Sequence, residues 1–596
     1  MRLAALLAAL VFATLGCASD AAAADPRKVI RTAYPSAERG FDCVQESDEF
    51  TSTLCDNIFE TLLQYDYLAR PVRLQPRTAE ALPEVTEGGR VYTLRIKHGI
   101  RFTPDAAFGG KPRELVAADY VFSIKRILDP AVHSQWLFLI EDKIEGADAI
   151  TADAKKTGRF DYDRPMAGLV ALDRYTLRIR LKQPDYKLAY ILTMPATAAV
   201  AREVAERYGA GFAEHPVGTG PYRLAAWRRS QRVVLEANPG YREEYFESAG
   251  GDDPRDAAII EHLKGKRLPL AGRVEISVID EHQPRWLAFL GGEHDYIRPL
   301  PVEFADQAMP NGKLAPNLAR QGIEVRPDEV PWITYTTFNM DDPVVGGYTP
   351  EKVALRRAMC LGYPVEEEIA TIYKYQAVKA DSPIAPGMAG YTDERSPTLE
   401  YDPARAKALL DMYGYIDRDG DGFREQPDGS PLVIDQASLP EQRSRDRNRL
   451  WSRAMADIGI RMTFDKVEKL PDLRREAQYG KVQSFTYGWL ADYPDGEDFL
   501  QLFWSKSIGA GNYSMFRDAE FDRLYERIQT LPDSPERTEI YRRMVHIIWV
   551  YAPWRVNSLI RGSVLIHPWL LGYKKHPFAQ EQFRYLDIDV TRRPHG

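Results

Sequence analysis

PVGTGPYRL, at residues 216–224, combines a turn with the start of a strand. The glycines at 218 and 220 and the prolines beside them predict a tight turn, after which Tyr222 begins the strand. The turn lacks the lysine with which a glycine-rich loop would hold a phosphate. We therefore expect it to have a structural role.

Strand and helix patterns alternate on both sides of this turn. Apolar and polar residues alternate over 177–181 and 274–278, which is typical of half-buried strands. Apolar residues recur at intervals of three and four over 117–128, which is typical of a helix. Asp402 followed by Pro403 is typical of a helix start. The mixture predicts an α/β or α+β architecture.

The composition is that of a globular protein. Of the 596 residues, 44% are hydrophobic and 28% are charged, which are ordinary proportions. The formal net charge is −8 and no long basic run occurs, so we expect no nucleic-acid partner. Four cysteines without a CxxC pair cannot form a disulfide framework.

The first residues are expected to be an export signal. Residues 3–15 form an apolar run of 13 residues after Arg2, and a helix needs roughly 20 to span a bilayer. An A-x-A motif ending at Ala24 predicts a signal peptide over 1–24 that is cleaved before Asp25. One alternative is a lipoprotein anchored at Cys17, and another is an uncleaved anchor.

The sequence contains no catalytic motif that we recognise. GxSxG, HExxH and GxxxxGK[ST] are absent, and the ten histidines do not pair at metal-ligand spacing. DRDGDG at 417–422 matches the start of a calcium loop, but its position 12 is Asp428 where glutamate is usual. We therefore expect no enzyme, no metal site and no cofactor, and an Asp/Gly-rich turn at 417–422.

An acidic residue lies among aromatic residues in FTYGWLADYP, at 485–494. Tyr and Trp suit ligand clefts because they combine a broad apolar surface with a polar tip. Asp492 would be costly to bury without a partner. Either it is exposed, or it pairs with a cationic group of a ligand.

Several segments, in order, resemble the family-5 solute-binding proteins of ABC importers, the oligopeptide- and dipeptide-binding group. RELVAADYVFSIKRILDP at 113–130 and PVGTGPY at 216–222 are the most similar. The resemblance extends over about 57–525. Further matching segments are NIFETLL at 57–63, LEANPGY at 235–241, FN at 338–339, VALRRA at 353–358, YDP at 401–403 and FRDAEFD at 516–522.

The resemblance implies an α/β, two-lobed periplasmic-binding-protein-like fold of type II with an extra subdomain. Lobe I would comprise 25–328, with a subdomain at about 72–212, and the return segment 553–596. Lobe II would comprise 329–552. Crossing strands would join the lobes, which would close on a ligand by a hinge motion. The chain would be a monomeric periplasmic receptor that delivers short peptides to an ABC permease in the inner membrane.

The resemblance also implies a ligand site. In peptide binders of this family, the aspartate of a W-x-x-D-Y block pairs with the ligand's α-ammonium, and here that residue is Asp492. Trp489 would pack on the peptide, and the backbone of 489–491 would bind it as an added strand. The expected substrate-binding residues are Glu46, Trp489, Leu490, Ala491, Asp492 and Tyr493.

Two rival functions stay open. The same fold could bind a metal chelate, haem, a glutathione-like compound or a sugar, or the chain could be a secreted hydrolase. YPV at 363–365 departs from the family's usual D-R, and the cations that would bind a peptide's carboxylate cannot be located from the sequence.

Export also permits a disulfide. We expect one between Cys43 and Cys55, with Cys360 reduced. Two buried free thiols are the alternative, because sequence spacing does not fix the Cβ geometry.

Overall fold

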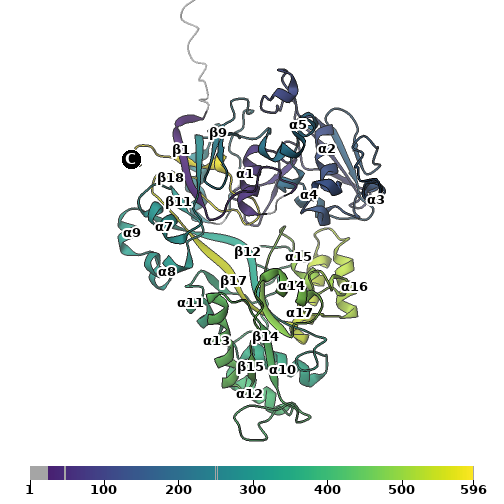
Figure 1. Ribbon diagram of the computed structural model, residues 1–596, viewed down its shortest axis with the longest axis vertical. Coiled ribbons are helices and arrows are strands. Elements are labelled where there is room, and N and C mark those ends of the chain that lie inside the picture. Colours follow the sequence, from purple (N-terminus) through teal and green to yellow (C-terminus); the bar gives the residue numbers. More distant parts are fainter. Residues whose placement is uncertain (1–23, 46–47, 249, 252, 595–596) are drawn as a thin grey trace, which may run out of the picture.

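The computed structural model describes residues 24–45, 48–248, 250–251 and 253–594. Two lobes lie one above the other, and two long strands run between them (Figure 1). The predicted signal peptide up to residue 23, including Cys17, lies outside the described residues, and so does Glu46. Within the described part of the chain, no helix is long and apolar enough to cross a membrane.

The two strands that join the lobes are β12 (Glu324–Phe338) and β17 (Trp554–Ile566). They are antiparallel partners over most of their length, with register shifts near the middle. The second half of β12 is rich in β-branched and aromatic residues and is almost entirely buried, so it fits the centre of a sheet. The lobe boundaries expected at 328 and 553 fall within or beside these strands, and we propose that the chain passes from one lobe to the other there.

The upper lobe contains a four-stranded sheet at its centre. Its order is β1 (Asp25–Tyr34), β10 (Ala271–Val278), β9 (Arg232–Ala237) and β8 (Tyr222–Arg228). β1 and β10 are parallel, and the other neighbours are antiparallel. The chain returns to this lobe after β17 and ends there (Figure 1), where β18 (Leu570–Leu571) pairs with β19 (Asp587–Ile588).

The PVGTGPY turn packs against the end of α1 (Glu49–Ile58). A Cβ atom at Gly218 or Gly220 would overlap the backbone of α1 at the Ile58 carbonyl. The Gly220 N–H donates a hydrogen bond of 2.8 Å to that carbonyl oxygen. The glycines therefore allow two backbones to approach closely, and β8 begins at Tyr222 as predicted.

A second sheet of the upper lobe lies beside the first, within the proposed subdomain. Its order is β4 (Glu84–Thr86), β5 (Val91–Arg95), β7 (Thr176–Arg180) and β6 (Leu169–Ala171). Helix α2 (Ala117–Leu128) contacts β6 and β7, and its span confirms the helix predicted there. The Asp119 carboxylate accepts a hydrogen bond of 2.8 Å from the Val116 N–H, which satisfies a donor at the helix start.

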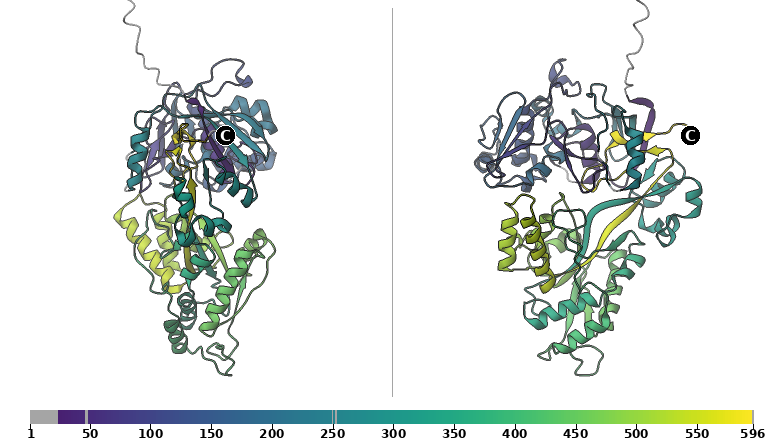
Figure 2. Two further views of the ribbon diagram at one scale, coloured as in Figure 1. Left: turned by 90° about the vertical axis from the view of Figure 1, so that its left-hand side faces the viewer. Right: turned by 180° about the vertical axis from the view of Figure 1, so that it is seen from behind.

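The lower lobe is built on the sheet that contains the crossing strands. The order is β11 (Tyr296–Ile297), β17, β12, β16 (Ser484–Leu490), β14 (Val433–Ala437) and β15 (Arg461–Thr463), and β13 (Ala377–Lys379) also pairs with β17. Helices cover this sheet in all three ribbon views (Figures 1 and 2). They include α10 (Pro350–Leu361), α12 (Pro403–Met412), α13 (Gln442–Asp457), α14 (Leu470–Gln478), α16 (Ala519–Ile528) and α17 (Pro535–Tyr551).

Candidate ligand-binding site

A cavity of about 540 Å³ lies between the lobes, within the size range of small-molecule sites. Both lobes and the crossing strands contribute to its wall. Lining residues include Trp136 and Phe578 from the upper lobe, Trp332 and Ile560 from the crossing strands, and Arg443 and Asp492 from the lower lobe. The position between two lobes is the one that a hinge motion would open and close.

The end of strand β16 places part of the predicted W-x-x-D-Y block in the wall of this cavity. β16 pairs with β12, where Leu490 lies opposite Trp332. Leu490, Ala491 and Asp492 line the cavity, so the structure brings these three predicted residues together. Leu490 is 49% exposed and Trp332 is 41% exposed, as expected for apolar side chains that face an open cleft.

Trp489 and Tyr493 lie behind the wall. Neither is among the described residues that line the cavity. The Trp489 ring packs against the hydrophobic cluster of the lower lobe, and the hydroxyl of buried Tyr493 donates a hydrogen bond of 2.7 Å to Glu497 Oε2. In this geometry the two aromatic residues support the segment that carries Asp492. Stacking of Trp489 on a ligand stays a prediction without support from these contacts.

The Asp492 carboxylate has no hydrogen bond or ion pair with another described residue. Burial raises its pKa to about 6, because the charged form is poorly solvated there. A cationic ligand group would supply the missing partner. Asp492 is thus a half-buried acid in the cavity wall, and its pairing with a cationic ligand group stays a prediction.

A second acid stands behind Asp492. Asp498 is 1% exposed, and its Oδ2 accepts hydrogen bonds from Trp489 Nε1 at 2.9 Å and from the Asp492 N–H at 3.1 Å. Its Oδ1 accepts a hydrogen bond of 2.9 Å from Gln501 Nε2. Burial and then the charge of Asp492 raise the pKa of Asp498 well above its usual value. Asp498 therefore holds its proton more readily than an ordinary aspartate, and in this geometry it fixes the segment that carries Asp492.

Arg443 is a cation that the sequence did not reveal. It lies on α13, lines the cavity and is exposed. Its guanidinium lies 5.9 Å from the centre of the Tyr373 ring, and no carboxylate among the described residues forms an ion pair with it. In the sequence it is one of several arginines on a polar helix, and nothing marks it out before the fold is known.

Two other cations of the wall, Arg298 and Lys575, pair with carboxylates of the protein itself. Arg298 is buried between Glu49 at 2.7 Å and Asp328 at 2.9 Å. Lys575 lies 3.5 Å from Glu49. Burial alone would raise the pKa of Glu49, but Arg298 and Lys575 lower it to about 2. Glu49 thus lines the cavity from the start of α1, three positions after the expected Glu46.

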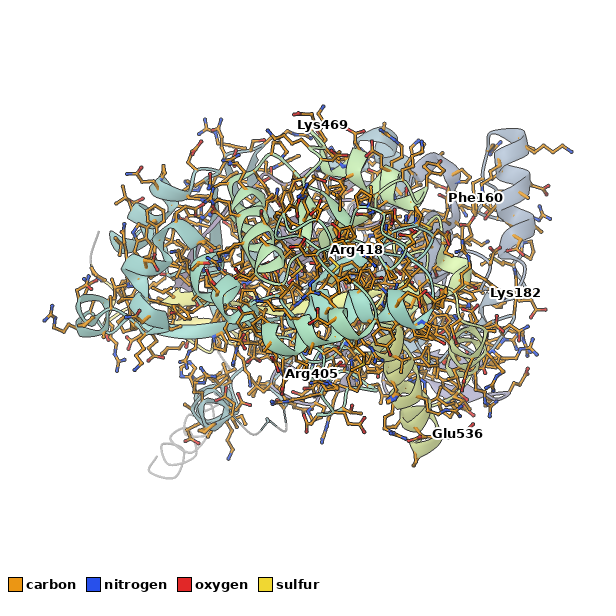
Figure 3. All side chains as sticks on the ribbon, turned by 90° about the horizontal axis from the view of Figure 1, so that it is seen from below. Phe160, Lys182, Arg405, Arg418, Lys469 and Glu536 are labelled. Carbon is orange, nitrogen blue, oxygen red and sulfur yellow. A yellow bond between two sulfur atoms is a disulfide. The ribbon has the colours of Figure 1, made fainter. Side chains whose placement is uncertain are left out.

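The loop at 417–422 is an exposed turn at the lower end of the molecule, where Figure 3 shows Arg418. Oxygens of Asp417, Asp419 and Glu425 lie within 4.8 Å of one another. The Asp417 carboxylate accepts hydrogen bonds from the N–H groups of Gly420 and Gly422, at 2.7 and 2.9 Å. These bonds account for the turn without an ion, and the expectation of no metal there stays a prediction.

The family model for "Bacterial extracellular solute-binding proteins, family 5 Middle" matches residues 73–511. The chain belongs to this family. Its members are solute-binding proteins of ABC importers, so the chain is a transport protein and not an enzyme.

The chain is similar to characterised proteins over almost its whole length. It is 26% identical to heme-binding protein A of Haemophilus influenzae, and this match covers 87% of this chain and 84% of that protein. It is 24% identical to di/tripeptide-binding protein 2 of Pseudomonas aeruginosa, over 96% of this chain and 98% of that protein.

A solved structure shows the same fold. The periplasmic binding protein DppA from Helicobacter pylori, in complex with the peptide STSA, superposes with a TM-score of 0.66. Sequence identity is 22%, and the match covers 94% of this chain and 98% of that one. The likeness confirms the predicted two-lobed fold.

Proposed function

We propose that this chain captures short peptides in the cavity between its lobes and delivers them to an ABC permease. The observation that carries the proposal is the Asp492 carboxylate, which is half-buried in the cavity wall and has no partner among the described residues. A peptide's α-ammonium would supply the hydrogen-bonded counter-charge that such a carboxylate needs.

A free edge of strand β16 favours an extended ligand. β12 occupies one edge of β16 over its whole length, but β14 pairs with the other edge only at Ser484 and Phe485. The rest of that edge, up to Leu490, has no strand partner among the described residues. A peptide backbone could pair there as an added strand, with its ammonium at Asp492.

The unpaired guanidinium of Arg443 suits the other end of such a ligand. Arginine binds carboxylates through two parallel hydrogen bonds, and Arg443 lines the same cavity from α13. We therefore assign Asp492 to the amino end and Arg443 to the carboxyl end of a bound peptide.

The proposal includes the setting in which the protein works. The amino-terminal 24 residues would direct export and be removed, and the mature chain would act as a monomer in the periplasm. The alternative anchor at Cys17 would keep it attached to the membrane surface by a lipid.

Mass spectrometry of the ligand that remains bound through native purification tests the proposal. Short peptides with free amino termini are the expected finding. Haem, a metal chelate or a sugar released from the wild type, with no peptide, would contradict it. A variant with Asp492→Asn serves as the control, because it should release much less peptide while its fold is intact.

A further inference from the structure

A buried ion pair joins the two lobes beside the cavity. Lys187 directly precedes α4 (Leu188–Ile191) of the upper lobe, and its Nζ lies 3.0 Å from Oε2 of Glu497. Glu497 begins α15 (Glu497–Leu500) of the lower lobe. The two side chains are 11% and 3% exposed. Helices α4 and α15 face each other across the gap between the lobes (Figure 1).

The acid of this pair is fixed in its own lobe. Glu497 accepts hydrogen bonds from the hydroxyls of Tyr493 and Tyr525, both of the lower lobe. Burial alone would raise the pKa of Glu497, but Lys187 and the two hydroxyls lower it to about 2. Burial alone would lower the pKa of Lys187, but Glu497 and Asp185 raise it. Both groups are therefore charged throughout the neutral range.

Separation of the lobes would remove Lys187 and leave Glu497 with its two hydroxyl donors only. A buried charge that loses its partner is strongly unfavourable, so the pair favours the closed arrangement. We propose that Lys187 and Glu497 form a latch that holds the lobes closed over a bound ligand and slows its release.

The latch is connected to the ligand site on both sides. Asp492 of the cavity wall directly precedes Tyr493, whose hydroxyl binds Glu497. On the other side, α4 leads from Lys187 to residues 193–195, which line the cavity. A ligand that draws these two walls together also brings the latch residues into contact. The inference rests on the proposed function only in that some ligand occupies the cavity.

A second ion pair between the lobes provides a matched control. Lys374 Nζ lies 3.1 Å from Asp306 Oδ2, and their side chains are 34% and 63% exposed. Asp306 belongs to α8 (Val302–Ala308), and Lys374 precedes β13, which pairs with the crossing strand β17. An exposed pair beside the crossing strands contributes little and moves little when the lobes rotate about those strands.

The experiment compares Lys187→Met with Lys374→Met and wild type, first without ligand. Small-angle X-ray scattering should show a larger radius of gyration for Lys187→Met, and no change for Lys374→Met. Circular dichroism verifies that both variants are folded. Equal radii for wild type and Lys187→Met, or an equal expansion of both variants, would overturn the latch.

The second readout is the release of trialanine, followed by stopped-flow fluorescence. Lys187→Met should release it at least about tenfold faster, with an association rate within about twofold of wild type. Glu497→Gln should act in the same direction and, because the two residues act as a pair, the double variant should add little to either single change. Unchanged release rates would overturn the latch. If wild type does not bind trialanine, trialanine is not a ligand of the cavity, and the scattering result alone decides about the latch.

Discussion

Asp492 carries a charge that the described residues do not neutralise. Its position follows from the end of β16, which turns the backbone of 490–492 into the cavity. Asp498 fixes that turn by accepting the Asp492 N–H and the Trp489 indole N–H. A poorly solvated carboxylate without a partner in a cavity wall is typical of a functional position, and we propose that a cationic group of a ligand pairs with it.

The raised pKa of Asp492 predicts a pH dependence of binding. An ammonium binds the ionised carboxylate, which the empty site loses as the pH falls through about 6. Affinity for a short peptide should therefore be nearly constant above about pH 7 and fall up to about tenfold per pH unit below about pH 6. Calorimetry across this range measures it.

Asp492→Asn is the control for that profile, because it keeps the shape of the side chain and does not ionise. Its weak residual affinity should vary little over the same range. A wild-type profile as flat as that of the variant would show that Asp492 does not titrate in the binding equilibrium.

Among the structural elements, the predicted turn at PVGTGPY gives the clearest prediction about stability. Gly218→Ala would place a Cβ against the Ile58 carbonyl of α1, and the overpacked backbone should lose about 1–3 kcal/mol of unfolding free energy or more. Thermal unfolding followed by circular dichroism measures the loss. Gly211→Ala is the matched control, since its Cβ would have no neighbour within 4 Å, and it should leave the melting temperature nearly unchanged.

The segment before α1 is attached to that helix by a disulfide between Cys43 and Cys55. The loop that it closes, with a sequence separation of 12, should contribute roughly 3 kcal/mol by restricting the unfolded chain. Thiol titration of denatured, unreduced mature protein should find one free thiol, that of Cys360. Three free thiols would contradict the bridge.

Patterns in the sequence predicted elements better than contacts between elements. Helix α2 and strand β7 follow directly from the periods of their apolar residues, because each buries one face. Of the residues that line the cavity, the sequence indicated only the continuous block at 490–492. Arg443 lies in the cavity wall, and Lys187 pairs with Glu497 across the lobes. Both come from distant segments, and only the arrangement of the lobes gives them these positions, so no local pattern could identify them.

At the scale of the whole molecule, two long strands allow the lobes to move as units. Each lobe has hydrophobic clusters of its own, whereas the cavity and the Lys187–Glu497 pair lie between the lobes. Opening would therefore break few packed contacts, and a ligand that binds both walls can shift the balance towards closure.

The central claim is that Asp492 pairs with the α-ammonium of a peptide, and one calorimetric comparison tests it most directly. Free and N-acetylated forms of the same short peptide are titrated into wild type and into Asp492→Asn. Loss of one partner of such a pair costs about 3–5 kcal/mol, which is about two to three and a half decades of affinity. The account predicts tight binding only for the free peptide and wild type, and equal affinities in all four combinations would contradict it.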